Sequence, residues 1–441
     1  MSSSLIRNAT ILTMNDAWDI VEGAVSVRDG RIASVGPEPV GPHDRTIDAA
    51  GGFLLPGFVQ THIHLCQTLF RGYADDLRLM DWLRQRIWPM EAAHTPASLR
   101  AAARLACLEL LRGGTTAILT METVHDTDAV FEAATEVGIR ATIGKCMMDA
   151  PPPDAPARLH EETHRSLDES AALHERWDRT SGGRIRAAFA PRFAVSCSRD
   201  LLEAVASLAG RELALVHTHA SEQQQEIELV RRLTGRSNID YLADVGLATP
   251  RLCAAHCVWV DEREQQMLAE REVKVMHCPG SNLKLGSGIA PVPEMLAKGI
   301  CVSLGADGAA CNNHLDMFGE MRLAATLQTL RHGPGALTAK QVLWMATRHG
   351  ACTLGLEHGI GSIQAGRRAD LILVDRDRPH LQPVSDPYST LVYAARPDDV
   401  RLTMVDGEIL VHDFAPTRLD PRDVAMTARH EAHALAARAA I

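Results

Sequence analysis

Eight short apolar segments, separated by amphipathic ones, occupy the middle of the chain and limit the folds that it can adopt. The amphipathic segments, such as SLRAAARLACLELLRGG and EQQQEIELVRRLTG, carry apolar residues at helical spacing. Strands that alternate with helices predict an α/β fold, and eight of them predict a closed parallel (β/α)8 barrel of the TIM type. The predicted strands are residues 59–64, 115–121, 140–146, 185–190, 214–219, 252–256, 273–277 and 301–307.

The two ends of the chain resemble each other. GAVSVRDGRIASVG near the start and DVRLTMVDGEILVHD near the end each contain two β-rich runs joined by Asp-Gly, a strong hairpin signal. We therefore expect residues 1–54 and 360–420 to form one small β-sandwich, with the barrel of residues 55–359 inserted between its halves. The Ala-rich residues 421–441 are expected to form a C-terminal helix.

Composition excludes several classes of partner. The formal net charge of -10, and the absence of any Lys/Arg run with interleaved aromatic residues, argue against nucleic acid. The opening residues MSSSLIRNATILTMND do not have the pattern of a signal peptide, and no apolar stretch reaches transmembrane length. The 10 Cys are scattered without a Cys-x-x-Cys pair, which predicts buried thiols in a reducing compartment. We expect a cytoplasmic enzyme that does not bind membranes.

Potential metal ligands close several of the predicted strands. His62, His64, His219, His256 and Asp307 each fall at the end of an apolar run, and the carboxyl ends of barrel strands converge on one rim. One His-x-His is expected by chance among 20 His, so the strand-end context carries the argument. His62, His64, His219 and Asp307 together suit one divalent ion per subunit, with Zn²⁺ favoured and Fe²⁺ as the alternative.

Glu222, three residues after His219, is the candidate proton carrier. A divalent ion makes water a usable nucleophile near neutral pH, but the reaction still needs a group that moves protons. The alternative is that Glu222 caps the following helix together with Ser221. His256 is expected to orient the attacking water with Asp307, or to act as a further ligand.

Two further histidines have open roles. His217 lies two residues before His219 and either supports a ligand from behind or belongs to the barrel core. The same two roles, support of a ligand or packing in the core, are open for His277.

These motifs occur together in a known group of enzymes. The chain resembles the amidohydrolase superfamily, in the branch of adenosine-type and guanine deaminases and triazine hydrolases, through PGFVQTHIHLCQTLFRG, HTHASE, AHCVW, HCPGSNLKL and GADGAACNN. The resemblance implies His62, His64, His219 and Asp307 as ligands and Glu222 and His256 as catalytic residues. It also implies that Glu91 lines the substrate pocket, where nucleoside-using relatives bind ribose hydroxyls.

The same resemblance bears on the number of metal ions. Binuclear relatives commonly use a carboxylated lysine at the end of the fourth strand, but here that strand ends AAFAPRF. Lys145 lies on the third strand and is expected to be structural. We therefore expect a mononuclear site.

The substrate is less closely defined by the motifs. A glutamate at position 222 favours deamination over dechlorination, because an amine leaves poorly until it is protonated. APRFAVSCS resembles guanine deaminase, where the arginine holds a purine oxygen, and Gln67 also fits that enzyme. GADGAACNN and RGYADDLRLMDWL instead resemble the nucleoside and triazine enzymes. Gln67 and Arg192 are therefore candidate substrate-binding residues with Glu91 and His256, or simply hydrogen-bonding groups of the rim.

The prediction from sequence is a metal-dependent aminohydrolase that removes an exocyclic amine from a purine-like ring and releases ammonia. A 5'-deoxyadenosine- or S-adenosylhomocysteine-type nucleoside, or free guanine, is the expected substrate. The first alternative is a triazine or pterin amino- or chlorohydrolase, and the second is an inactive barrel that serves as a scaffold. The resemblance also suggests a homodimer or homotetramer.

Overall fold

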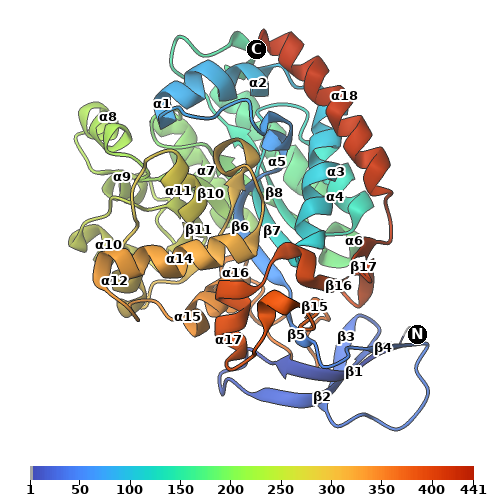
Figure 1. The fold of residues 1–441 in the computed structure, drawn as a ribbon. Coiled ribbons are helices and arrows are strands. Elements are labelled where there is room, and N and C mark those ends of the chain that lie inside the picture. Colours follow the sequence, from blue (N-terminus) through green and yellow to red (C-terminus); the bar gives the residue numbers. More distant parts are fainter. Residues whose placement is uncertain (1–2) are drawn as a thin grey trace.

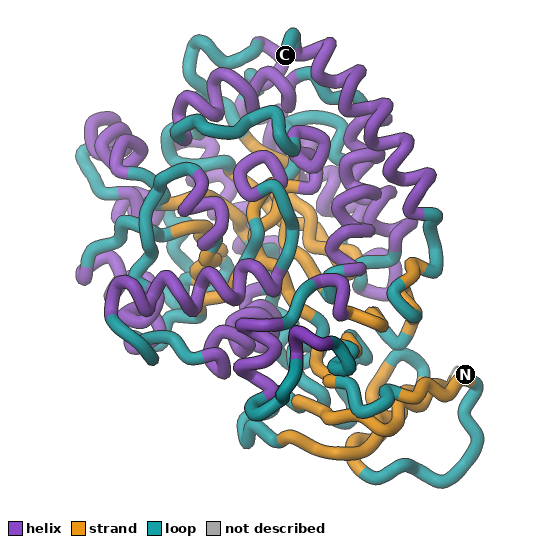
Figure 2. The backbone as a smooth tube through the Cα atoms, viewed as in Figure 1, coloured by secondary structure: helices purple, strands orange, loops and turns teal. Residues whose placement is uncertain are grey.

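The computed structural model describes residues 3–441, and its larger part is a ring of parallel strands surrounded by helices (Figures 1 and 2). The strands follow one another in the order β13-β12-β11-β10-β9-β8-β7-β6-β14. Because β14 follows β13 in the chain after two residues and pairs with β6, the ring closes. The strands are β6 (Phe58–His64), β7 (Thr115–Met121), β8 (Arg140–Met147), β9 (Ile185–Pro191), β10 (Val216–Ala220), β11 (Leu252–His256), β12 (Lys274–His277), β13 (Val302–Leu304) and β14 (Asp307–Gly308).

The predicted barrel is therefore confirmed, with one change in its last strand. Residues 301–307 were expected to form one continuous strand, but the strand is interrupted at Gly305 and Ala306. Gly305 lies against the backbone of His62, where an added Cβ would come 2.5 Å from the His62 carbonyl oxygen. This close approach between the first and last strands breaks the regular ladder.

Helices connect the strands and form the outer layer in Figure 1. Several begin at a capped residue; α3, for example, has the Thr95 and Ser98 side chains in a reciprocal capping box. The helices of six or more residues are α3 (Pro96–Arg112), α4 (Asp128–Val137), α5 (Thr163–Trp177), α7 (Arg199–Glu212), α8 (Gln224–Thr234), α9 (Asn238–Asp244), α10 (Glu262–Glu270), α11 (Pro279–Lys284), α12 (Val292–Ala297), α14 (Met317–His332), α15 (Ala339–Trp344) and α18 (Pro421–Ala439). Shorter ones include α1 (Leu79–Trp82), α2 (Trp88–Ala92), α6 (Thr180–Gly183), α13 (Ala309–Asn312), α16 (Gly350–Thr353) and α17 (Pro387–Ser389).

Strands from both ends of the chain form a second sheet, beside the barrel in Figure 1. Residues of both halves share one apolar core, which includes Ile6, Val25, Leu371 and Met404. The two predicted Asp-Gly turns also meet, since Gly407 would clash with Gly30 if it carried a Cβ. The strands are β1 (Ser3–Leu12), β2 (Ile20–Arg28), β3 (Arg31–Gly36), β4 (Arg45–Asp48), β5 (Phe53–Pro56), β15 (Leu371–Val374), β16 (Val400–Val405), β17 (Glu408–His412) and β18 (Ala415–Pro416).

A buried ion-pair network joins this terminal sheet to the barrel. Arg140 begins β8, and its guanidinium lies 2.8 Å and 3.0 Å from the two carboxylate oxygens of Asp370. The same guanidinium lies 2.7 Å from Asp406 in the turn between β16 and β17. Burial lowers the pKa of Arg140, but the charges of Asp370 and Asp406 outweigh it and raise that pKa above its usual value.

The C-terminal helix α18 packs along α3 and α2 (Figure 1). Its buried residues are Val424, Ala428, Leu435 and Ala436, while Asp420 caps its first turn by accepting a hydrogen bond from the backbone of Arg422. Among the helices of residues 3–441, none combines the length and the apolar character that a membrane span requires.

Candidate metal centre and active site

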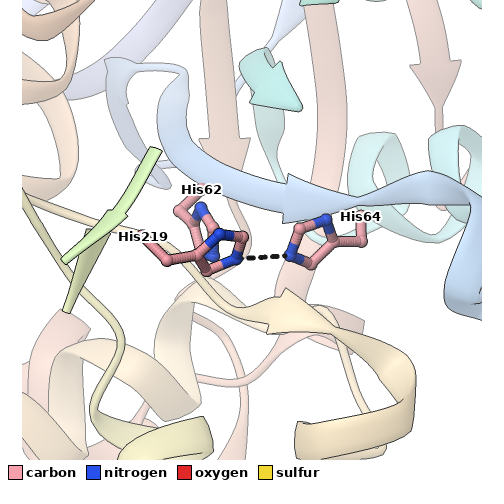
Figure 3. A group of neighbouring side chains, drawn as sticks. All are labelled: His62, His64 and His219. Carbon is pink, nitrogen blue, oxygen red and sulfur yellow. Dashed lines mark hydrogen bonds between the residues drawn. The ribbon is translucent and has the colours of Figure 1, made fainter. Parts of the chain in front are cut away.

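Histidines from two strands meet an aspartate at the carboxyl end of the barrel. His62 and His64 come from β6, His219 from β10 and Asp307 from β14, and Figure 3 shows the three imidazoles turned toward one another. The ligand atoms of His62, His64 and His219 all lie within 4.8 Å of one another, as do those of His62, His256 and Asp307. The convergence expected of strand ends in a barrel is therefore present.

The tautomers of two rings point to a cation. Nδ1 of His64 lies 2.7 Å from the Met121 carbonyl oxygen, and Nδ1 of His219 lies 2.7 Å from that of Arg192. A carbonyl only accepts, so each Nδ1 carries a proton, and in the neutral ring each Nε2 has a bare lone pair. These two Nε2 atoms face each other at 3.3 Å (Figure 3). Facing lone pairs repel, whereas a divalent ion beside them would be bound by both.

The carboxylate of Asp307 completes this donor set. Its Oδ1 lies 3.2 Å from Nε2 of His64 and 3.3 Å from Nε2 of His62. Burial opposes ionisation, but the nearby His62 and His64 outweigh it and hold the pKa of Asp307 well below its usual value. Burial lowers the pKa of His62 to about 4 and that of His219 well below its usual value. Burial also lowers the pKa of His64, but its hydrogen bond to Asp307 and the charge of that carboxylate outweigh burial and raise it above its usual value. A divalent metal binds neutral imidazoles and an ionised carboxylate, so it would displace any proton on Nε2 of His64.

The backbone is strained at this end of the barrel. His256 at the end of β11 has φ 72°, and Asp307 has φ 62°, so both non-glycine residues adopt the left-handed region. Such conformations cost on the order of 1–3 kcal/mol and persist where the surrounding structure enforces them. Here they turn both side chains toward the histidine cluster.

His217 supports His62 from behind. Its Nε2 lies 2.6 Å from Nδ1 of His62, and both rings are fully buried. One proton shared between these nitrogens leaves Nε2 of His62 free to face Asp307. His217 thus has the position of a group that orients a ligand rather than that of a ligand.

Glu222 lies over the same centre, before the start of α8. Its Oε1 accepts a 2.8 Å hydrogen bond from the hydroxyl of Ser287, and its Oε2 lies 3.7 Å from Nε2 of His256. Burial raises the pKa of this carboxyl above its usual value. A carboxyl group that holds its proton more firmly is suited to act as an acid as well as a base.

The helix cap is a different glutamate. Glu226 accepts hydrogen bonds from the backbone N–H groups of Glu222 and Gln223, and α8 begins with Gln223 as its N-cap. The capping alternative for Glu222 is therefore wrong. The Glu222 side chain is left free to face the cavity.

His256 is fixed between a partner and the centre. Its Nδ1 lies 2.9 Å from Oδ1 of Asn282, while its Nε2 faces Glu222 and lies 3.9 Å from Oδ2 of Asp307. The imidazole thus spans the gap between the carboxyl of Glu222 and the carboxylate of Asp307. Water between these three groups would be held by both an acid and a base.

Gln67 and Arg192 line the same cavity as Glu222, and Glu91, which is not among the lining residues, binds both of them. The Arg192 guanidinium lies 2.6 Å and 3.3 Å from the two oxygens of Glu91, and Nε2 of Gln67 donates to Glu91 at 3.1 Å. All three side chains are buried, and Oε1 of Gln67 has no hydrogen-bond partner within residues 3–441. Arg192 thus engages Glu91 through two nitrogens.

The cavity has a polar floor and an apolar cover. Its volume, with the open mouth included, is about 450 Å³. Its lining consists of His64, Gln67, Leu79, Trp82, Leu83, Arg192, Phe193, His219, Glu222, Glu226, His256, Leu285 and Asp307. Leu79 and Trp82 of α1 thus share the lining with polar groups of the metal centre.

Comparison with known proteins identifies the family. The model of the amidohydrolase family matches residues 53–410. The chain belongs to the amidohydrolase family. Its relatives include the 5'-deoxyadenosine deaminase of Methanosarcina mazei, 40% identical over 99% of both chains. They also include the 5-methylthioadenosine/S-adenosylhomocysteine deaminase of Symbiobacterium thermophilum, 41% identical over 94% of both chains. A zinc-bound adenosine deaminase from Xanthomonas campestris has 33% identity and a TM-score of 0.92 over 99% of both chains.

Lys145 is engaged elsewhere in this amidohydrolase. It lies on β8, where its ammonium pairs with the buried carboxylate of Glu161 and donates to the carbonyl oxygen of Cys146. The end of β9 carries no lysine. Neither position therefore offers a bridging group for a second ion.

Sequence reasoning missed several groups that shape the site. Ser287 and Asn282 hold Glu222 and His256, but neither belongs to a local pattern that indicates this contact. Glu122 follows β7 and accepts hydrogen bonds from the backbone N–H groups of Leu65 and Cys66, directly after His64. Its place after a strand is the same signal that identified Asp307. Glu122 could therefore have been predicted to lie at the site.

Proposed function

We propose that this amidohydrolase is a hydrolytic deaminase of adenosine-type nucleosides, which replaces the exocyclic amine of the ring by oxygen and releases ammonia. The observation that carries the proposal is Glu222, a buried carboxyl with a raised pKa, held by Ser287 and 3.7 Å from His256. The names of the deaminase relatives support the adenosine-type substrate. An inactive scaffold is disfavoured, because potential metal ligands and the carboxyl of Glu222 converge on one centre.

We assign the metal site to His62, His64, His219 and Asp307. Three imidazole nitrogens and one carboxylate oxygen suit zinc, and the similar enzyme with bound zinc supports that choice over iron. A bound divalent ion would lower the pKa of water to near neutrality.

Protein side chains would carry the proton steps. His256 and Asp307 orient the attacking water, and Glu222 passes a proton to the ring nitrogen next to the carbon under attack. The proton that Glu222 gives to the ring nitrogen comes from the attacking water. Once oxygen has added to that carbon, the remaining hydroxyl proton passes through Asp307 to Glu222, which delivers it to the amine, so the carbonyl forms as ammonia leaves. Glu222 is needed twice, since an unprotonated amine is a poor leaving group.

The variant Glu222→Gln tests this mechanism. The amide cannot shuttle protons, so we expect ammonia release to fall about 10²–10⁴-fold. Metal content should remain near that of the unmodified protein. Glu228→Gln, on the exposed side of α8, is the matched control and should keep full activity. Near-normal ammonia release by Glu222→Gln would remove the glutamate from the reaction.

A second candidate substrate is an aminated ring that carries a carbonyl, such as guanine. The ion pair between Arg192 and Glu91 favours it, because a ribose that bound Glu91 would compete with two short contacts to the guanidinium. The unpartnered Oε1 of Gln67 could accept from a ring N–H. A nucleoside would thus need Glu91 to bind its ribose, whereas guanine would need Arg192 to bind its carbonyl.

A substrate panel separates these candidates. Ammonia release is measured for 5'-deoxyadenosine, S-adenosylhomocysteine, guanine and an aminotriazine, and chloride release for a chlorotriazine. The main proposal expects the highest kcat/KM with one of the nucleosides, and a Glu91→Gln variant that raises KM for it. A preference for guanine that Arg192→Gln abolishes would favour the second candidate. Release of chloride alone would contradict both.

A further inference from the structure

A second hollow lies at the end of the barrel opposite the metal centre. It encloses about 1140 Å³ measured to its open mouth, between the starts of β10, β11 and β12 and the helix α16. Arg251, Lys274, Cys352 and Thr353 are among its lining residues. The metal ligands belong to the carboxyl ends of the strands, so this hollow is separate from the catalytic cavity.

Thiols gather at the wall of this hollow. Cys352 lies on α16, and Cys301 lies directly before β13, where its Sγ reaches Thr353, the residue next to Cys352. Sγ of Cys301 is 3.6 Å from the carbonyl oxygen of His349 and 3.9 Å from the hydroxyl of Thr353. Sγ of Cys253 lies 3.5 Å from the carbonyl oxygen of Thr353. Thr353 of α16 is therefore contacted by Cys253 and Cys301 and directly follows Cys352 in the chain.

Cys352 differs chemically from every other cysteine. The hydrogen bond from Cys301 lowers the pKa of Cys352 to about 7, and the ammonium of Lys274 lowers it further against the effect of burial. The pKa of Cys301 is raised well above its usual value, first by its hydrogen bond to Cys352 and then by burial. The pKa of each of the other eight cysteines is also raised, mainly by burial.

Exposure separates the two thiols of the pair from the rest. Cys301 and Cys352 are partly exposed, whereas the remaining eight cysteines are buried. Cys352 lines the hollow, and Cys301 lies outside the lining, close to Thr353. A reagent that entered the hollow would therefore meet Cys352, with Cys301 in position to react second.

We propose that Cys352 and Cys301 form a reactive thiol pair that exchanges with small-molecule disulfides at this hollow. The thiolate of Cys352 attacks one sulfur of the disulfide, which forms a mixed disulfide and expels one thiolate. Cys301 then attacks the Cys352 sulfur, which forms the Cys301–Cys352 disulfide and expels the second thiolate. The two protein protons go to the two expelled thiolates. One small disulfide is reduced for each protein disulfide formed.

This pair would be a modification site independent of the deaminase reaction. The resulting bond would tie α16 to the residue that precedes β13, the strand segment that leads to Asp307. Lys274 donates to the carbonyl oxygen of Glu272 at 2.9 Å and forms no ion pair with a carboxylate of residues 3–441, so its charge is available to the thiolate.

The first test measures reactivity of all ten cysteines in the folded, metal-loaded protein. A short pulse of iodoacetamide at pH 7 is followed by quenching, digestion and mass spectrometry of each cysteine peptide. Because the thiolate is the reactive form, we expect Cys352 to be alkylated at least about tenfold faster than any other cysteine. Equal labelling of Cys352 and the buried cysteines would overturn the proposal.

The second test follows exchange with 2-hydroxyethyl disulfide. The unmodified protein should lose two hydrogens and yield a peptide pair joined through Cys301 and Cys352. Cys301→Ser should stop at a stable mixed disulfide on Cys352, and Cys352→Ser should leave Cys301 unmodified. A lasting mixed disulfide in the unmodified protein, or a bond from Cys352 to Cys253, would overturn the role of Cys301.

The variant Lys274→Gln separates chemistry from folding. Removal of the ammonium should slow alkylation of Cys352 several-fold at pH 7. Above pH 9 the thiol is ionised in either protein, so the two alkylation rates should be nearly equal. An unchanged urea-unfolding midpoint shows that the variant is folded. Alkylation at an undiminished rate would contradict the role of Lys274.

Discussion

Each histidine at the proposed metal centre has a fixed partner on the side of its ring that faces away from the centre. His64 and His219 use backbone carbonyl oxygens, whereas His62 uses the ring of His217 at 2.6 Å. A carbonyl is held by the strand itself, but a side-chain partner can be exchanged. His217 is therefore the residue at which the orientation of one ligand can be altered without changing any ligand.

Replacing His217 tests how far this support matters. His217→Leu leaves Nδ1 of His62 without a buried partner, so we expect zinc affinity to fall about 10–100-fold, measured by competition with a chelator. His217→Gln keeps a hydrogen-bonding group and should recover part of the loss. Equal affinity in the leucine variant would mean that His62 is oriented by packing alone.

At the scale of elements, the interruption between β13 and β14 shapes the site. Gly305 passes so close to β6 that an added Cβ would lie 2.5 Å from the oxygen and 2.7 Å from the nitrogen of His62. Two residues later, Asp307 adopts a left-handed backbone conformation and rejoins β6. The closure of the barrel and the placement of the carboxylate are thus one local arrangement.

The variant Gly305→Ala tests this coupling. Since the contacting atoms are backbone, they cannot move aside cheaply, and β6 and the following segment must separate. We expect a large loss of zinc affinity and of ammonia release, together with a lower urea-unfolding midpoint. Gly210→Ala in α7, where an added Cβ meets nothing within 4 Å, is the matched control; it should keep zinc affinity and ammonia release and should not lower the unfolding midpoint. A fully metal-loaded Gly305→Ala enzyme would show that β6 and the segment before Asp307 can move apart without loss of the metal site.

At the scale of the whole molecule, sequence patterns predicted the barrel because strands and helices have local periodicities. The observed β7 and β11 have the predicted ends, and the strand-end histidines meet because the topology brings strand ends together. The break at Gly305 depends on β6, about 240 residues away in the chain, and has no local signature. The pairing of Arg192 with Glu91 joins residues 101 positions apart, so the motifs alone did not reveal that these two candidates bind each other.

Buried neutral histidines also give the whole molecule a pH dependence. His94 lies between α2 and α3, where its Nε2 is 3.1 Å from the Cys66 carbonyl oxygen and its Nδ1 is 2.9 Å from the Ser98 hydroxyl. Burial lowers its pKa from 6.5 to about 3, and burial likewise lowers the pKa of His277 to about 3. Between pH 6.5 and 3, these two histidines are therefore protonated in the unfolded chain but neutral in the folded protein. The stability contributed by each neutral histidine is complete above pH 6.5 and falls as the pH drops toward 3.

The variant His94→Gln should weaken this acid sensitivity. One histidine of this kind costs about 1.4 kcal/mol per pH unit, or about 2 kcal/mol between pH 6.5 and 5. We therefore expect the free energy of unfolding in urea to fall by about 2 kcal/mol less from pH 7 to 5 in the variant than in the unmodified protein. Glutamine retains an N–H for the Cys66 carbonyl oxygen, so the fold should survive. His430→Gln, on the exposed face of α18, should leave the dependence unchanged. Parallel curves for His94→Gln and the unmodified protein would mean that His94 accepts a proton in the folded state.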